Sequence, residues 1–138
     1  MPYERLIYLA DTDAAGVVYF AHLLSICHEA YEFSLAQFGI NIKDFFKDSP
    51  VALPITQAEI QFFRPLFCGD RIQIDFTVRS LSENEFELHY KIYLAEIMVG
   101  KAKTRHVCIA PTARQRIPFP ESLKNWLRYL STLEDTSI

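Results

Sequence analysis

Residues 8–39 read YLADTDAAGVVYFAHLLSICHEAYEFSLAQFG and contain the longest helical pattern in the chain. Within them, apolar side chains recur at spacings of three and four, at Leu24, Cys27, Tyr31, Leu35 and Phe38. Neighbouring apolar residues widen this stripe, so the helix, at residues 21–38, is expected to be mostly buried. Gly39 is a helix stop signal. The preceding DTDAAGVVYF, residues 11–20, is rich in Asp, Thr and Gly, which favours a loop. The sequence therefore predicts a loop that leads directly into a buried helix.

The hydrophobic period changes to two in the second half of the chain. Residues 71–79 and 85–94 alternate between apolar and polar side chains, as strands of an antiparallel sheet with one solvated face do. Further elements are predicted as strands at residues 3–9, 53–63 and 99–109 and as a terminal helix at 120–130. Small side chains on one face of residues 99–109 would let a helix approach closely. One long helix wrapped by a curved antiparallel sheet is an α+β fold, expected to form one domain over residues 1–138.

Composition and charge argue against several classes of protein. Half of the 138 residues are hydrophobic, which suits a packed core. The net charge of −3 offers no positive field to nucleic acid. No apolar run approaches the roughly 18 residues of a membrane span, and no secretory signal is recognised, so a cytoplasmic location is expected. The three widely spaced cysteines favour reduced, buried thiols over disulfides or a zinc site, and neither a metal nor another cofactor is expected.

The loop before the helix carries the residues best suited to catalysis. Asp11 and Asp13 lie beside Gly16, just before a helix whose first backbone N–H groups are unpaired and partly positive. Such donors can hold the oxyanion that forms when a thioester carbonyl is attacked. A nearby carboxylate can act as a nucleophile or as a base that activates water. Because an aspartate before a helix is more often a cap or a turn former, the pattern alone leaves both interpretations open.

The same loop resembles the signature of the 4-hydroxybenzoyl-CoA thioesterase family, whose members have the hotdog fold. The resemblance rests on DTDAAGVVYFAHLL, residues 11–24, and on EIQFFRPLFCGD, residues 59–70. It implies thioester hydrolysis with Asp13 as the catalytic carboxylate, the backbone N–H of Phe20 polarising the carbonyl, and Asp11 ordering the loop. The orienting and pocket residues that it implies are Gly16, Val17, Tyr19, His22 and Leu23. In the family an aromatic residue usually stands a few residues into the helix, near the position of Leu23 here. The resemblance therefore does not define the shape of the acyl pocket in this chain.

A narrower resemblance concerns the acyl group. CHEAYE, residues 27–32, is similar to the helix of the cyanobacterial and plastid-type hydrolases of 1,4-dihydroxy-2-naphthoyl-CoA, which serve phylloquinone synthesis. This likeness implies that an aromatic acyl-CoA is hydrolysed to the free acid and CoA. The candidate contacts to the CoA phosphates are Arg64, Lys101, Lys103 and Arg105. Because family members join their sheets as dimers, often paired into tetramers, a homodimer or homotetramer with the site at the interface is expected.

Other interpretations stay open. A second branch of hotdog thioesterases takes its carboxylate from the helix, where Glu29 and Glu32 lie. Cys27 beside His28 suggests a thiol nucleophile, although adjacent helical residues point about 100° apart and Cys27 belongs to the apolar stripe. The same fold also hosts thioesterases for other acyl-CoA or acyl-carrier-protein substrates and non-catalytic acyl-CoA-binding proteins.

Overall fold

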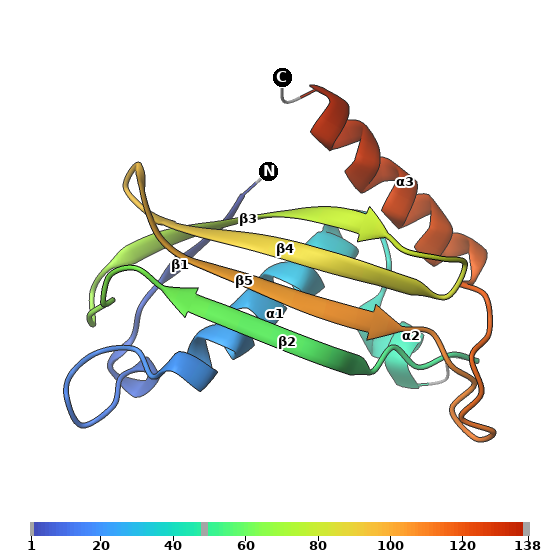
Figure 1. The fold of residues 1–138 in the computed structure, drawn as a ribbon, viewed down its shortest axis with the longest axis horizontal. Coiled ribbons are helices and arrows are strands. Elements are labelled where there is room, and N and C mark those ends of the chain that lie inside the picture. The colour runs from blue at the N-terminus through green and yellow to red at the C-terminus, as the bar shows by residue number, and fades with distance from the viewer. Residues whose placement is uncertain (1, 48–49, 137–138) are drawn as a thin grey trace.

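The chain forms a five-stranded antiparallel sheet with a long helix lying across one face (Figure 1). The structure, a computed structural model, describes residues 2–47 and 50–136. The strand order is β1-β3-β4-β5-β2, so β1 and β2 are the edges. The elements are β1 (Tyr3–Leu6), the 3-10 turn η1 (Leu9–Asp11), α1 (Phe20–Gln37), α2 (Ile42–Lys47), β2 (Ile55–Phe62), β3 (Arg71–Ser80), β4 (Glu85–Leu94), β5 (Ile97–Val107) and α3 (Glu121–Thr136). This is the predicted α+β layout, with α3 extending beyond its expected end.

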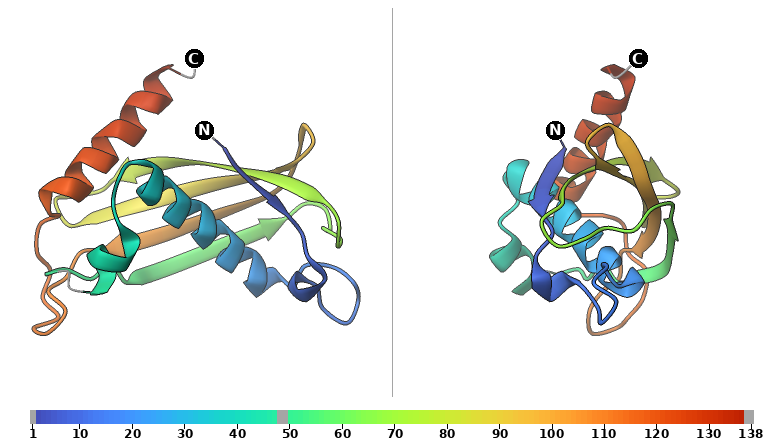
Figure 2. Two further views of the ribbon diagram at one scale, coloured as in Figure 1. Left: turned by 180° about the vertical axis from the view of Figure 1, so that it is seen from behind. Right: turned by 90° about the vertical axis from the view of Figure 1, so that its left-hand side faces the viewer.

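Helix α1 follows the predicted apolar stripe. It begins after Tyr19, whose backbone is extended, and ends before Gly39, whose φ of +95° suits a residue without a side chain. Its buried residues are Leu23, Ile26, Cys27, Ala30, Tyr31 and Leu35. The expectation that most of the helix is buried is wrong for the single chain, because the sheet covers only one side of it (Figure 2). On the open side Phe33 remains 36% exposed.

The alternation predicted for the central strands is confirmed. In β3 and β4, Ile74 lies opposite Ile92 and both side chains are buried against α1, while Asp75 lies opposite Lys91 and both are exposed. In β5 the small residue Gly100 faces α1. A Cβ built there would lie 3.8 Å from Cδ2 of Leu23, an ordinary contact, and 3.0 Å from the backbone oxygen of Gln61 on the neighbouring strand β2. The tighter limit on a side chain at Gly100 therefore comes from β2 and not from the helix.

Helix α3 covers one end of the core, with the apolar face predicted for it. Its buried residues there include Leu123, Trp126, Leu127 and Leu130. The indole N–H of Trp126 donates to the hydroxyl oxygen of Ser34 at 3.0 Å, which ties α3 to α1. None of the described helices has the length and apolarity needed to cross a bilayer.

The cysteines depart in part from expectation. All three are free thiols. Cys27 and Cys108 are buried as predicted, but Cys68 is exposed because it lies in the turn between β2 and β3. The expectation of a buried thiol is therefore wrong at Cys68.

Candidate active site

The loop that precedes α1 is a narrow hairpin. Thr12 and Val18 form an isolated antiparallel bridge at its base. Nearer the tip, the N–H of Asp13 donates to the carbonyl oxygen of Val17 at 2.8 Å, and the N–H of Gly16 donates to the carbonyl oxygen of Asp13 at 3.0 Å. Gly16 has a φ of +83°, a conformation that strains most other residues, so the sequence fits the turn.

The two carboxylates of this loop lie in opposite environments. Asp11 is 6% exposed and is surrounded by donors. It accepts hydrogen bonds from the guanidinium of Arg5, from the N–H of Tyr8 at 2.8 Å and from Nε2 of His22 at 2.7 Å. The Arg5 guanidinium, above all, holds the pKa of Asp11 well below its usual range. Both carboxylate oxygens of Asp11 therefore already accept hydrogen bonds from other parts of the fold. Asp11 orders the loop and offers no free oxygen to a substrate.

The carboxylate of Asp13 is exposed at the tip of the hairpin. Its Oδ1 accepts the N–H of Ala15 at 2.8 Å and lies 3.4 Å from the N–H nitrogen of Val17, which fixes the direction of the side chain. No residue among those described donates to its Oδ2. Asp13 is thus the carboxylate of the pair that is both oriented by the backbone and free to react.

The start of α1 presents unused backbone donors. Tyr19 occupies the N-cap position but makes no capping hydrogen bond with its side chain. Its carbonyl oxygen accepts the N–H groups of His22 and Leu23, at 2.9 Å and 3.2 Å. Within the described residues the N–H groups of Phe20 and Ala21 have no acceptor, as is usual for the first turn of a helix. These amides can receive an anionic or polarised oxygen.

An open, apolar hollow of about 390 Å³ lies against the start of α1. It is lined by Val17, Val18, Phe20, Phe62, Phe63, Arg64 and Pro65. Its wall therefore joins the hairpin and the helix start to the end of β2, which lie at the same end of the molecule (Figure 1). Asp13 does not itself line the hollow, but its Oδ1 lies 3.4 Å from the backbone nitrogen of Val17, which does.

The other expected pocket residues occupy four different environments. Val17 and Phe20 line the hollow. Tyr19 is exposed, and its ring centroid lies 4.9 Å from that of Phe20. His22 turns toward Asp11, and Leu23 is fully buried in the core between helix and sheet. The structure thus places Val17 and Phe20 on the wall of one hollow, whereas Asp13, Gly16 and Tyr19 are exposed parts of the adjoining hairpin and Leu23 belongs to the core.

The four basic candidates lie in two places: Arg64 follows the end of β2, and the other three share one face of β5. Arg64 lines the hollow beside Phe20. Lys101 and Lys103 alternate with inward-facing Gly100 and so lie on the face of the sheet away from α1. On that same face Lys103 pairs with Glu59 at 3.6 Å, and Arg105 pairs with Glu85 at 2.8 Å. Within one chain, Arg64 is therefore the basic candidate placed beside the reactive end of the site.

The rival catalytic groups on α1 are engaged elsewhere. Both oxygens of Glu29 accept hydrogen bonds from Arg5, and Tyr3 also donates to this carboxylate. Glu32 pairs with His28 one turn before it, at 3.1 Å. Burial raises the pKa of the Cys27 thiol to about 12, so this thiol stays protonated and unreactive at neutral pH. Arg5 itself is not indicated by the sequence, because its two partners stand 6 and 24 positions further along the chain.

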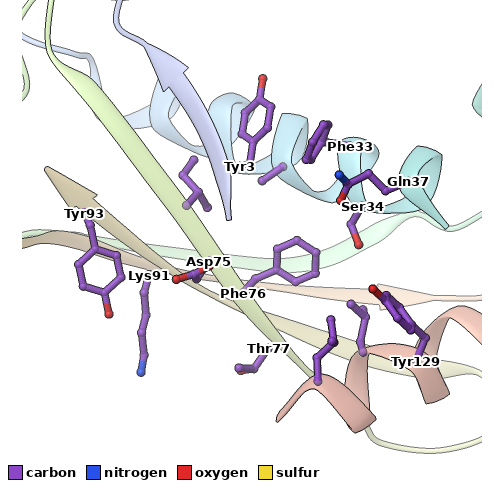
Figure 3. Close-up of a pocket in the computed structure, with 14 residues that line it drawn as sticks. Tyr3, Phe33, Ser34, Gln37, Asp75, Phe76, Thr77, Lys91, Tyr93 and Tyr129 are labelled. Carbon is purple, nitrogen blue, oxygen red and sulfur yellow. The ribbon is translucent and has the colours of Figure 1, made fainter. Parts of the chain in front are cut away.

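A second hollow, of about 340 Å³, lies between α1, β3 and α3 (Figure 3). Its aromatic side chains are those of Tyr3, Phe33, Phe76, Tyr93 and Tyr129. It contains none of the expected site residues. Across residues 2–47 and 50–136, no group of three His, Cys, Asp or Glu side chains is arranged to hold a metal ion.

Comparison with known proteins identifies the family. The model of the Thioesterase-like superfamily matches residues 7–127, most of the chain. The chain belongs to this superfamily. It is 94% identical, over all 138 residues of both proteins, to the 1,4-dihydroxy-2-naphthoyl-CoA hydrolase of Microcystis aeruginosa. It is 58% identical over 129 residues to the hydrolase of the same name from Rippkaea orientalis, which covers 91% of this chain and 94% of the relative.

A solved structure supports the same assignment. The crystal structure of a 1,4-dihydroxy-2-naphthoyl-CoA thioesterase from Synechocystis matches with a TM-score of 0.88 at 40% identity, over 94% of this chain and 96% of that one. The predicted hotdog architecture is therefore confirmed.

Proposed function

We propose that this chain hydrolyses the thioester of 1,4-dihydroxy-2-naphthoyl-CoA to the free acid and CoA. The proposal takes its substrate from the names of the relatives in Microcystis, Rippkaea and Synechocystis. The chain shares 94% identity with the relative from Microcystis. It takes its chemistry from the candidate site. The observation that carries it is an aromatic hollow lined by Phe20, whose helix amide is unpaired, and by Val17, whose N–H together with that of Ala15 orients the exposed Asp13 carboxylate.

Each part of the site has a role in the reaction. The thioester carbonyl oxygen accepts the N–H of Phe20, which stabilises the negative charge that develops on it. The Asp13 carboxylate either attacks the carbonyl carbon or removes a proton from an attacking water. In both routes the C–S bond breaks and CoA leaves as a thiolate that takes up a proton. The direct route adds one step, in which water cleaves the anhydride between Asp13 and the acyl group.

The hollow suits a flat aromatic acyl group. Phe20, Phe62 and Phe63 supply three aromatic faces, and stacked or edge-on rings add to the free energy of burying the acyl surface. The hollow is open in the single chain, so an acyl group would be covered on one side only. We propose that a second copy of the chain supplies the missing wall.

The proposed assembly is a homodimer, or a tetramer built from two such dimers. Large apolar side chains are exposed around the same end of the molecule, at Tyr8, Leu9, Tyr19, Phe20, Phe63 and Phe67. Strand β2 is an edge of the sheet, and its end at Phe62 forms part of the hollow. An exposed apolar patch beside an unpaired strand edge is typical of an interface. In such a dimer Arg64, Lys101, Lys103 and Arg105 are the proposed contacts to the CoA phosphates.

A substrate panel tests the proposal. Release of the CoA thiol is followed with 1,4-dihydroxy-2-naphthoyl-CoA, benzoyl-CoA, a short aliphatic acyl-CoA and an acyl group carried on acyl-carrier protein. We expect kcat/KM for the naphthoyl ester to exceed that for the aliphatic ester by at least about a hundredfold, since the loss of a large aromatic contact surface costs several kcal/mol.

Two results would contradict the proposal. A preference for the protein-borne acyl group would make the chain an acyl-carrier-protein thioesterase. Tight binding of acyl-CoA without any thiol release would make it a non-catalytic acyl-CoA-binding protein.

A further inference from the structure

His22 links the start of α1 to the strand-and-turn segment before the hairpin. It stands in the first turn of the helix, two residues after Phe20. Its Nε2 lies 2.7 Å from Oδ1 of Asp11. Because Arg5 holds Asp11 in its ionised form, the carboxylate can only accept, and Nε2 of His22 is the donor.

Asp11 in turn is fixed to the rest of the fold. Nη1 and Nη2 of Arg5 donate to its two oxygens at 2.5 Å and 3.2 Å. The remaining nitrogen of the same guanidinium, Nε, donates to Glu29 on α1 at 2.7 Å. Arg5, on β1, therefore links two parts of the fold: the turn that contains Asp11 and the middle of α1. All the groups concerned are at least partly buried.

The bond from His22 closes a ring around the reactive hairpin. Residues 12–19 form a hairpin that protrudes between Asp11 and the start of α1. The hydrogen bond between Asp11 and His22 spans this base, and the bridge between Thr12 and Val18 lies inside it. The relative placement of the Asp13 carboxylate and the Phe20 amide depends on how firmly that base is held.

We propose that His22 is a positioning residue, which holds the Phe20 amide in register with the Asp13 carboxylate through its hydrogen bond to Asp11. The proposal rests on the proposed thioesterase function. His22 does not line the hollow, so its effect passes through the geometry of the loop. Misplacing an oxyanion donor weakens the transition state more than the bound substrate, so loss of this bond lowers kcat and leaves KM nearly unchanged.

Three variants test this role. His22→Ala removes the bond. His22→Gln restores a donor at a similar distance from the backbone. His28→Ala is the matched control, because His28 lies on the same helix, has a side chain 42% exposed against 39% for His22, and also pairs with a carboxylate. Steady-state kinetics are measured with 1,4-dihydroxy-2-naphthoyl-CoA, and amide hydrogen exchange is measured over residues 12–20.

We expect His22→Ala to lower kcat by about tenfold to a hundredfold, with KM within about threefold of wild type. His22→Gln should recover most of the loss, and His28→Ala should match wild type. Amide exchange over the loop should be faster in His22→Ala and unchanged in His28→Ala. If the alanine variant does not fold, His22→Leu, which fills a similar volume, takes its place.

The proposal is overturned if His22→Ala has the kcat of His28→Ala, or if the glutamine variant is as slow as the alanine variant. If the proposed function itself is wrong, the wild-type protein will hydrolyse no acyl-CoA, and this separates the two kinds of failure. In that case hydrogen exchange alone decides the role of His22, and unchanged exchange over residues 12–20 in His22→Ala overturns it.

Discussion

His106 is a buried histidine whose environment makes stability depend on pH. Its ring stacks on Phe86 with the centroids 4.7 Å apart, and its Nε2 lies 2.8 Å from the hydroxyl of Thr104, which also contacts the hydroxyl of Tyr90. Burial lowers the pKa of His106 from 6.5 to about 4, so the folded protein holds this ring neutral at physiological pH. The unfolded chain binds a proton at higher pH than the folded chain does.

Lowering the pH should therefore destabilise the fold through His106. Since the folded pKa is depressed, its contribution is present above pH 6.5 and declines as the pH falls toward 4. Between pH 7 and pH 5 we expect the free energy of unfolding to drop by about 2 kcal/mol. Urea unfolding of wild type and His106→Gln at both pH values measures this drop. Equal drops in the two proteins would show that His106 is not responsible.

Part of the candidate site could be predicted from the sequence, and part could not. The loop, its glycine and the two aspartates were recognisable from residue types and from a family signature. The structure distinguishes the surroundings of the two aspartates: four protein donors reach Asp11, whereas Oδ2 of Asp13 has no donor among the described residues, which supports the proposed roles. The role of Arg5 was not predictable, since contacts between residues 24 positions apart leave no local pattern.

At the scale of elements, periodicity located the helices and strands because each buries one face. The weak alternation of residues 3–9 predicted a strand, and β1 occupies only Tyr3–Leu6, where β3 provides a partner. The order of the strands, with β2 placed beside β5 at the far edge, could not come from periodicity, because pairing depends on contacts distant in sequence. The extent of burial of α1 was overestimated, since the sheet covers a single side of it.

The packing around Gly100 in β5 leaves little room for a side chain, chiefly because the backbone of β2 lies close to it. A Cβ there would meet the backbone oxygen of Gln61 at 3.0 Å, and a larger group would extend toward Leu23. We expect Gly100→Val to lower the free energy of unfolding by about 1–3 kcal/mol, as overpacking of a core does. Thr77→Val, on the exposed face of β3, should stay within about 0.5 kcal/mol of wild type. Urea denaturation measures both, and equal stability of the two variants would refute the close approach.

At the scale of the whole molecule, the proposed site is open to solvent in a single chain. The hollow is open, the carboxylate of Asp13 is exposed, and Phe20, Phe62 and Phe63 line the hollow. A dimer that covers this end would bury the apolar patch and enclose the acyl group. Exclusion of water would then strengthen the electrostatic effect of the Phe20 amide on the thioester carbonyl.

Activity should therefore depend on assembly. We expect analytical ultracentrifugation to show a dimer or tetramer, and specific activity to fall on dilution in step with dissociation. Phe63→Glu places a charge in the exposed aromatic patch and should weaken the assembly, whereas Phe46→Glu, at an exposed aromatic on α2, should leave it intact. A monomer with full specific activity would disprove the shared site.

The most direct test of the account is the rate of Asp13→Asn. Asparagine keeps a side-chain oxygen for the N–H groups of Ala15 and Val17, so the hairpin keeps its shape while the charge is lost. With 1,4-dihydroxy-2-naphthoyl-CoA we expect kcat/KM to fall by at least about a thousandfold, and Asp44→Asn on α2 to match wild type. An Asp13→Asn enzyme that retains more than about a tenth of the wild-type kcat/KM would contradict the central role of this carboxylate.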